Sequence, residues 1–184
     1  MDGATLTGGF TDPARDSAEA FRAIMTAMAR PGTIHRLCGA HGPVSDAAAC
    51  VLLTLCDPDT PVWLAPSVDS SDLRAWLAFH TGAPLAEPAT AVFALGRWGE
   101  FPLEAFPVGT PAYPDRSTTL IVEMDDLRPE GATLAGPGIE TTAALALPET
   151  AFFRANAARF PLGLDTIFTA GDRVAALPRT TEVR

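Results

Sequence analysis

The segment from Asp46 to Cys56 constrains the fold more than any other, because it is apolar on nearly every face. Ser45 precedes it as a suitable N-cap, and Asp57-Pro58-Asp59 follows it as a stop, so we expect a helix here. A helix that lacks a polar face has to be covered on all sides by other elements. The apolar run is only about half as long as the ~20 residues of a membrane span, so a protein core must surround it.

Amphipathic helices and short apolar strands alternate along the rest of the chain. Asp12 and Pro13 open a helix over residues 13–30, in which Phe21, Ile24 and Met25 recur at helical spacing. We expect two more helices, one capped by residues 70–72 and stopped by 81–84, the other running from 148 to about 160. Short strands are expected at 33–37, 61–64, 91–95, 117–124, 132–134, 165–169 and 173–177.

The order of these elements predicts the fold class. The last two strands flank the turn Ala170-Gly171-Asp172 and form a hairpin, so the sheet is not purely parallel. Alternating helices and strands predict an α/β fold with a mixed sheet and helices on both faces. The length suits a single domain over residues 1–184. The irregular stretch 96–114 holds four prolines and three glycines, and we expect it to be an exposed functional loop.

The charge balance argues against one class of partner. Thirteen arginines stand against 22 acidic residues, a net charge of −9, which disfavours nucleic-acid binding through a basic surface. Residues 140–184 carry five arginines and five acidic residues, so an anionic small molecule meets least repulsion there. The sequence shows no targeting segment and no membrane span, and we expect a cytoplasmic protein.

Lysine is absent from the sequence, and all basic residues are arginine. Covalent pyridoxal phosphate catalysis needs a lysine amine for its Schiff base, so this chemistry is excluded. A Walker A phosphate loop also needs its lysine and is excluded for the same reason. We therefore expect no bound cofactor of these kinds.

Five residues are candidates for ligand binding. Asp115 can hold Arg116 in place for an anion, Arg179 is followed by two threonines, and Gly136 and Gly138 permit close backbone approach. His80 ends the apolar face of its helix, where a helix C-terminus favours an imidazolium. Each also has an ordinary interpretation: a surface ion pair, a solvated tail, simple turns and a capping histidine.

The spacing His35-x-x-Cys38-x-x-His41 raises two further possibilities, a metal site and a thiol nucleophile. The spacing does not match the usual structural zinc sites, and in an extended strand His35 and Cys38 point to opposite faces. We expect no metal site, and Cys38 as the nucleophile of an independent enzyme is a remote alternative. No complete catalytic set is evident, so a binding or assembly subunit is favoured over a free-standing enzyme.

Several segments together resemble one family, the PhnH proteins of the bacterial carbon–phosphorus lyase system for phosphonate catabolism. The order and spacing of the segments over essentially the whole chain carry the resemblance, rather than any single motif. The segments are Gly9-Phe10 through Ala29-Arg30-Pro31-Gly32, Leu53 through Asp59-Thr60-Pro61-Val62-Trp63-Leu64, Phe79-His80-Thr81-Gly82-Ala83-Pro84, Leu134-Ala135-Gly136-Pro137-Gly138-Ile139, Phe160-Pro161-Leu162-Gly163-Leu164-Asp165 and Leu177-Pro178-Arg179-Thr180-Thr181.

The resemblance implies a three-layer α/β/α fold similar to the large domain of pyridoxal-phosphate-dependent transferases, without the cofactor. It also implies a homodimer and an assembly with subunits G, I and J, in which a phosphonate displaces adenine from ATP to give a ribose 1-phosphonate 5-triphosphate. The family supplies no catalytic residues to carry over. The main hypothesis is an accessory subunit, and the alternative is a subunit with its own nucleotide or phosphonate site at Arg116 and Arg179.

Overall fold

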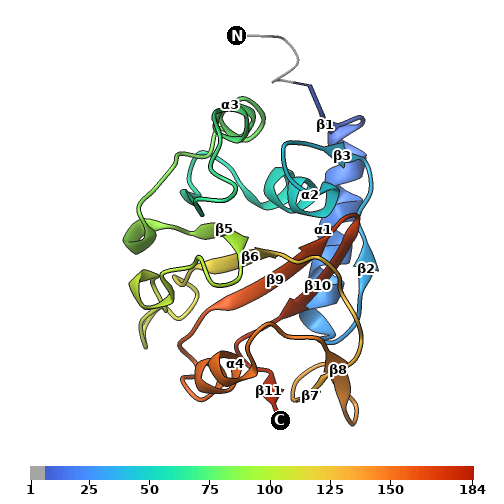
Figure 1. Cartoon of the computed structure of the whole chain (residues 1–184), viewed down its shortest axis with the longest axis vertical. Helices are drawn as coiled ribbons and strands as arrows, with labels where there is room; N and C mark the ends of the chain where they lie inside the picture. Colours follow the sequence, from blue (N-terminus) through green and yellow to red (C-terminus); the bar gives the residue numbers. More distant parts are fainter. Residues whose placement is uncertain (1–6) are drawn as a thin grey trace.

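The computed structural model describes residues 7–184 (Figure 1). The helices are α1 (Pro13–Ala29), α2 (Asp46–Leu55), α3 (Ser71–His80) and α4 (Thr150–Ala157), with short 3-10 helices η2 (Pro88–Thr90) and η3 (Leu103–Ala105). The strands are β1 (Gly9–Phe10), β2 (His35–Arg36), β3 (Ala40–His41), β4 (Val62–Leu64), β5 (Phe93–Arg97), β6 (Thr119–Glu123), β7 (Ala132–Ala135), β8 (Ala143–Leu145), β9 (Asp165–Ala170), β10 (Arg173–Leu177) and β11 (Glu182–Val183).

All four expected helices and all seven expected strands are present, with ends that shift by a few residues. The N-caps of the first three helices are also confirmed, because Asp12, Ser45 and Ser70 accept hydrogen bonds from the backbone N–H three residues later. Strands β1, β3, β8 and β11 have two or three residues each and were not expected.

The central sheet is mixed, as the sequence predicts. Its strand order is β2-β10-β9-β6-β5-β4, in which β4, β5, β6 and β9 are parallel while β10 pairs antiparallel with both β9 and β2. The hairpin β9–β10 pairs Thr169 with Val174. The four parallel strands give the sheet two distinct ends, which we call the amino end, where these strands begin, and the carboxyl end, where they finish.

One face of the sheet is covered by α1, α2 and α3. Alternate strand residues such as Leu95, Ile121 and Ile167 face this layer and form one apolar core with the helices. Residues 47–52 of α2 are all fully buried, so the helix without a polar face lies inside the protein, as expected. The longest of the helices, α1, has 17 residues, and no helix within residues 7–184 is long and apolar enough to cross a membrane.

The other face has a more varied cover than expected. Helix α4 packs there, with the Phe153 ring 5.8 Å from that of Phe168, and beside it lies a second sheet of order β11-β7-β8. In Figure 1 this layer lies below the central sheet, while α2 and α3 lie above it. The expectation of helices on both faces is therefore met, but a small sheet forms much of the second layer.

The stretch 96–114 is only in part the exposed loop that its prolines and glycines suggested, because residues 110–113 are exposed whereas Gly96, Phe101 and Phe106 are buried. Phe101 and Phe106 are 7% and 4% exposed, and both pack against Trp63 of β4. The stretch therefore helps to cover the second face of the sheet. The prediction of an exposed loop thus holds for residues 110–113 and was wrong for the two phenylalanines, because turn residues set the backbone path, whereas aromatic side chains between them decide burial.

Candidate functional site

The structure separates the five candidate residues. Arg116, Gly136, Gly138 and Arg179 lie around the amino end of the sheet, and His80 lies at the end of α3. A cavity of about 370 Å³ opens among the first group, and its lining includes Met28, Pro114, Asp115, Phe160, Pro161, Asp165, Pro178, Arg179 and Thr180. Of the five candidates, Arg179 is among the residues that line this cavity, whereas His80 lies apart from it.

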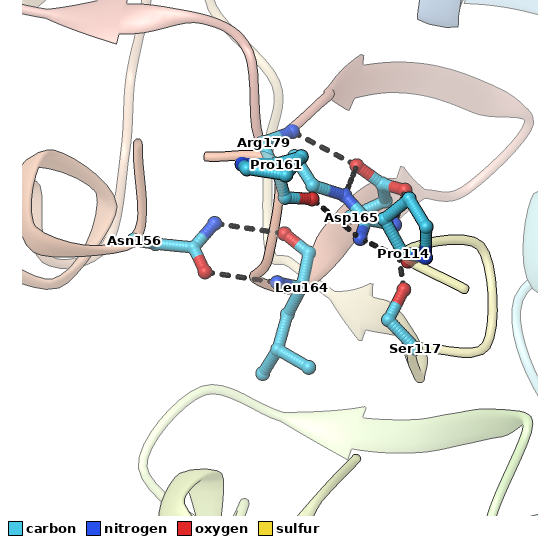
Figure 2. Close-up of polar contacts among 7 residues, drawn as sticks. All are labelled: Pro114, Ser117, Asn156, Pro161, Leu164, Asp165 and Arg179. Carbon is cyan, nitrogen blue, oxygen red and sulfur yellow. Dashed lines mark hydrogen bonds and ion pairs between the residues drawn. The ribbon is translucent and has the colours of Figure 1, made fainter. Parts of the chain in front are cut away.

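Arg179 is held by an extensive set of bonds within the protein (Figure 2). Its Nε and Nη2 donate to the two carboxylate oxygens of Asp165, at 3.1 and 2.5 Å, and the side chains are only 11% and 20% exposed. Nη1 donates to the Pro114 carbonyl at 2.7 Å and Nη2 to Ser117 Oγ at 2.5 Å, with a longer contact from Nη1 to the Pro161 carbonyl. All five guanidinium N–H donors are thus engaged, and an anion could bind here only by displacing one of these acceptors.

A second polar contact fixes the neighbouring turn. The Asn156 amide is 5% exposed and bonds the backbone of Leu164 twice: Nδ2 donates to its carbonyl and Oδ1 accepts from its N–H, both at 2.8 Å (Figure 2). The turn between them contains the cis bond before Pro161. Asn156 therefore ties the end of α4 to the start of β9, where Asp165 meets Arg179.

Arg116 has a different partner from the one expected. Its guanidinium carbon lies 4.0 Å from the centre of the Tyr113 ring, and no ion pair with Asp115 forms within residues 7–184. Both Arg116 and Tyr113 are exposed. Arg116 is thus a cation stacked on an aromatic ring at the surface, with its hydrogen-bond donors turned to solvent.

Gly136 and Gly138 approach the protein's own backbone. Both adopt positive φ, and a Cβ on Gly138 would lie 1.9 Å from the Ala29 carbonyl oxygen at the end of α1. A Cβ on Gly136 would lie 3.2 Å from the Thr180 carbonyl oxygen. The close approach inferred from the sequence is present, and in this structure it serves contacts between segments.

His80 is distant from this group and lies between aromatic rings. Its ring is 4.9 Å from both Trp76 and Phe79, and its Nε2 is buried with no hydrogen-bond partner in the described part of the chain. Gly9 covers it closely, since a Cβ there would come within 2.8 Å of the ring. A cavity of about 260 Å³ adjoins His80, Gly9 and Ser17.

The histidines and cysteines at 35–41 make separate contacts. His35 Nε2 lies 2.8 Å from Thr33 Oγ1, and His41 Nδ1 lies 2.8 Å from Asp46 Oδ1. No group of three or more His, Cys, Asp or Glu side chains within residues 7–184 is placed to hold a metal ion. Cys38 is exposed, and burial raises the pKa of the Cys50 thiol to about 11 and that of Cys56 to about 12.

The carboxyl end of the sheet holds a crevice that sequence reasoning missed. Its volume is about 250 Å³, and Ser45, Ser67, Ser70, Arg97 and Glu123 are among its lining residues. Arg97 and Glu123 are the last residues of β5 and β6. Burial raises the pKa of the Glu123 carboxyl, while hydrogen bonds from Ser45 partly oppose this shift. The available signal was the presence of charged residues where two buried strands end.

Comparison with known proteins decides the family. A family model described as "Bacterial phosphonate metabolism protein (PhnH)" matches residues 8–184. The chain belongs to the PhnH family. This membership confirms the resemblance inferred from the order of segments along the sequence.

Two similar proteins carry more specific descriptions. "Alpha-D-ribose 1-methylphosphonate 5-triphosphate synthase subunit PhnH" of Rhizobium meliloti (strain 1021) is 42% identical over 191 residues, covering 96% of this chain and 94% of the relative. "Putative C-P lyase subunit protein HtxG" of Stutzerimonas stutzeri is 32% identical over 177 residues, covering 89% of this chain and 84% of the relative. Both relatives are thus described as subunits, and both align over most of their lengths.

Proposed function

We propose that this PhnH-family chain is a subunit of the synthase that makes α-D-ribose 1-methylphosphonate 5-triphosphate in the carbon–phosphorus lyase pathway. The observation that carries the proposal is the 42% identity, over 96% of the chain, to the Rhizobium meliloti protein of that description. The description of the second relative as a carbon–phosphorus lyase subunit supports the same pathway.

The protein acts within an assembly rather than alone. In support, burial raises the pKa of the Cys50 and Cys56 thiols, which makes them poor nucleophiles. Arg179, the most buried arginine in an ion pair, bonds to groups of the protein itself rather than being free for a substrate. The chain forms one domain over residues 1–184, pairs with a second copy when isolated, and joins subunits G, I and J. Its layered mixed sheet is similar to the large domain of pyridoxal-phosphate-dependent transferases, although the sequence has no lysine to hold that cofactor.

Exposed apolar side chains beside the amino end are the surface that we expect a partner subunit to cover. Phe160 is 61% exposed at the cavity, which also includes Met28 of α1. Met25 and Phe21 lie exposed about one and two turns before Met28 on the same helix. Large apolar side chains gathered on one surface are typical of interaction sites. Arg116 and Tyr113, which flank the cavity residues 114–115 in the sequence, add an exposed stacked cation–aromatic pair.

Growth and co-purification test the proposal. In a bacterium whose own gene for this subunit is deleted, the chain should restore growth on methylphosphonate as sole phosphorus source, and it should co-purify with co-expressed subunits G, I and J. Growth on inorganic phosphate is the control for general fitness. Failure of both restoration and co-purification would contradict the proposal.

A matched pair of variants locates the contact. Phe160 and Phe79 are 61% and 63% exposed, so Phe160→Ser and Phe79→Ser make the same chemical change at equally accessible positions. We expect Phe160→Ser to weaken co-purification and Phe79→Ser to leave it unchanged. Equal behaviour of the two variants would remove the amino end as the partner surface without affecting the proposed pathway.

A further inference from the structure

The crevice at the carboxyl end of the sheet lies where α/β proteins most often bind their ligands. Strands β4, β5 and β6 are adjacent and parallel, and the residues that line the crevice are the last residues of β5 and β6 and the segments that follow β4 and precede α2. In open α/β sheets, ligands bind outside the carboxyl ends of the strands, at a point where the strand order reverses. The parallel strands β4, β5, β6 and β9 stand in sequence order, so the crevice shares only the carboxyl-end position with such sites. The position of the crevice does not specify a ligand. The side chains that line it have to show which chemical groups it can bind.

Two oppositely charged side chains stand next to each other in the crevice without pairing. Arg97 and Glu123 are direct partners in the register of β5 and β6, so their side chains leave the sheet on the same face. Arg97 nevertheless donates from Nη1 to the exposed Asp125, at 3.0 Å, and this is its only side-chain hydrogen bond in the described part of the chain. Arg97 and Glu123 therefore both line the crevice without bonding to each other.

Glu123 lines the crevice and, among the described residues, bonds through only one of its two carboxylate oxygens. Its Oε1 accepts from the backbone N–H of Ser45 at 3.1 Å and from the Ser45 hydroxyl at 2.9 Å. Oε2 has no hydrogen bond within residues 7–184. A carboxylate held in this way by two donors is oriented in advance, and its second oxygen can accept from a ligand.

The surrounding charge selects hydroxyl groups over phosphate. Glu100 accepts from the Ser67 N–H, the Ser67 hydroxyl and the Arg97 N–H, so it adds a second carboxylate beside the crevice. Together with Glu123 and Asp125 it makes three carboxylates around the single guanidinium of Arg97. A phosphate inside the crevice would be repelled, whereas hydroxyl donors would find carboxylate and serine acceptors.

We propose that this crevice binds the ribose hydroxyls of a nucleotide, with Glu123 accepting from the ribose diol, Arg97 closing the mouth and the triphosphate remaining outside. This proposal rests on the proposed function, in which the product contains a ribose 5-triphosphate, and it names the part of the substrate that this chain holds. Carboxylates recognise ribose diols in the same way at the ends of strands in dinucleotide-binding folds. Glu123 is here a binding residue, and no bond is made or broken by it.

Titration of the full-length ¹⁵N-labelled chain tests the site directly. ATP should shift the backbone amide signals of Ser45, Ser67 and Arg97, 2′-deoxy-ATP should bind about tenfold more weakly or worse, and inorganic triphosphate should leave these signals unmoved. Glu123→Gln should weaken ATP binding by about tenfold and abolish the preference for the 2′-hydroxyl. Arg97→Gln is a second variant that leaves the contact between Glu123 and Ser45 in place.

Matched controls are available on the β6–β7 connection. Glu130→Gln and Arg128→Gln make the same changes in an exposed ion pair, and both should bind ATP as the unmodified chain does. Thermal unfolding of each variant shows that it is folded. An absence of ATP-dependent shifts, equal binding of ATP and 2′-deoxy-ATP, or the same shifts with Mg²⁺ alone would each overturn the proposal. Restoration of growth and co-purification are measured independently, so the subunit function can stand while this site fails.

Discussion

The two ends of the central sheet carry similar residues to different effect. At the amino end, Arg179 and Asp165 are bonded to each other, and every guanidinium donor has an acceptor within the protein. At the carboxyl end, Arg97 and Glu123 occupy paired positions but bond to other residues and leave a crevice between them. A charged side chain whose donors and acceptors all bond within the protein holds the fold together. One with unused donors or acceptors is available to bind a ligand.

Charge counting along the sequence pointed to the opposite end. The neutral C-terminal quarter, with Arg179 in it, was the part in which an anion would meet least repulsion. In the structure the acidic residues around Arg97 make the carboxyl end unsuitable for anions but suitable for hydroxyl groups. The contrast between the two ends predicts that substitutions of the bonded charges at the amino end change stability, and that substitutions of the charges at the carboxyl end change ligand binding.

Asp165→Ala should give the largest effect. It leaves the Arg179 guanidinium, which is 11% exposed, without its counter-charge, and removal of one partner of a buried ion pair costs about 3–5 kcal/mol. Urea unfolding measures the loss. Glu19→Ala, in the exposed pair with Arg15 on α1, is the control and should cost less than about 0.5 kcal/mol. Equal decreases in the free energy of unfolding for the two variants would show that the pair of Asp165 and Arg179 does not stabilise the amino end.

Asn156→Ala should have the next largest effect and lower the free energy of unfolding by about 2–4 kcal/mol. The N–H and the carbonyl of Leu164 both lose their buried hydrogen-bond partner in this variant. The control is Thr26→Ala, whose hydroxyl bonds only to the carbonyl of Arg22 on the same exposed helix face. Chemical unfolding compares the two. A loss below about 1 kcal/mol for Asn156→Ala would mean that water replaces the amide.

Gly138→Ala should destabilise by at least about 1 kcal/mol more than Gly99→Ala. Both glycines have positive φ, at +81° and +95°, so both variants carry the backbone cost of a side chain in that region. Only at Gly138 would the new Cβ meet another atom, the Ala29 carbonyl oxygen, because nothing lies within 4 Å at Gly99. Identical midpoints in thermal unfolding would show that the contact between Gly138 and α1 relaxes freely.

Glu123→Gln should give the smallest change in stability, and one that depends on pH. Burial raises the folded-state pKa of Glu123 above its ordinary value of 4.5, so its contribution is present below that pH and is lost as pH rises through the folded pKa. The variant should therefore gain stability relative to the unmodified chain between about pH 4 and pH 7. Urea unfolding at both pH values measures this difference. If the variant instead loses stability relative to the unmodified chain as the pH rises, the Ser45 hydrogen bonds dominate.

Local signals accounted for most of the secondary structure. Caps at Asp12, Ser45 and Ser70 and the turn at Gly171 are encoded by neighbouring residues, and each was confirmed. The apolar spacing predicted the first helix, but Phe21 and Met25 on it are exposed. The burial of Phe101 and Phe106 within the stretch 96–114 was not predicted, because it depends on Trp63, which lies about 40 residues earlier in the sequence. Whether side chains in a stretch without regular spacing are buried depends on which other parts of the fold pack against them.

The candidate site was only partly accessible from the sequence. Arg116, Gly136, Gly138 and Arg179 were singled out and do lie in one region, but the partners of Arg179 are 14 to 65 residues away, and none is implied by its neighbours. Glu123 was missed because a charged residue at the end of a strand is ordinary until its surroundings are known. Its register partner Arg97 and its hydrogen-bond partner Ser45, 78 residues away, give it a distinct role.

By itself, the sequence determined the helices, the main strands, a mixed sheet and the family, because capping, side-chain periodicity and the order of segments are written in adjacent residues. Only the tertiary structure decided which charges are engaged and which are free. Charge–charge distances depend on strand register and on how layers pack, and in this protein those arrangements join residues as far apart as 65 positions for Arg179 and Pro114 and 78 positions for Ser45 and Glu123.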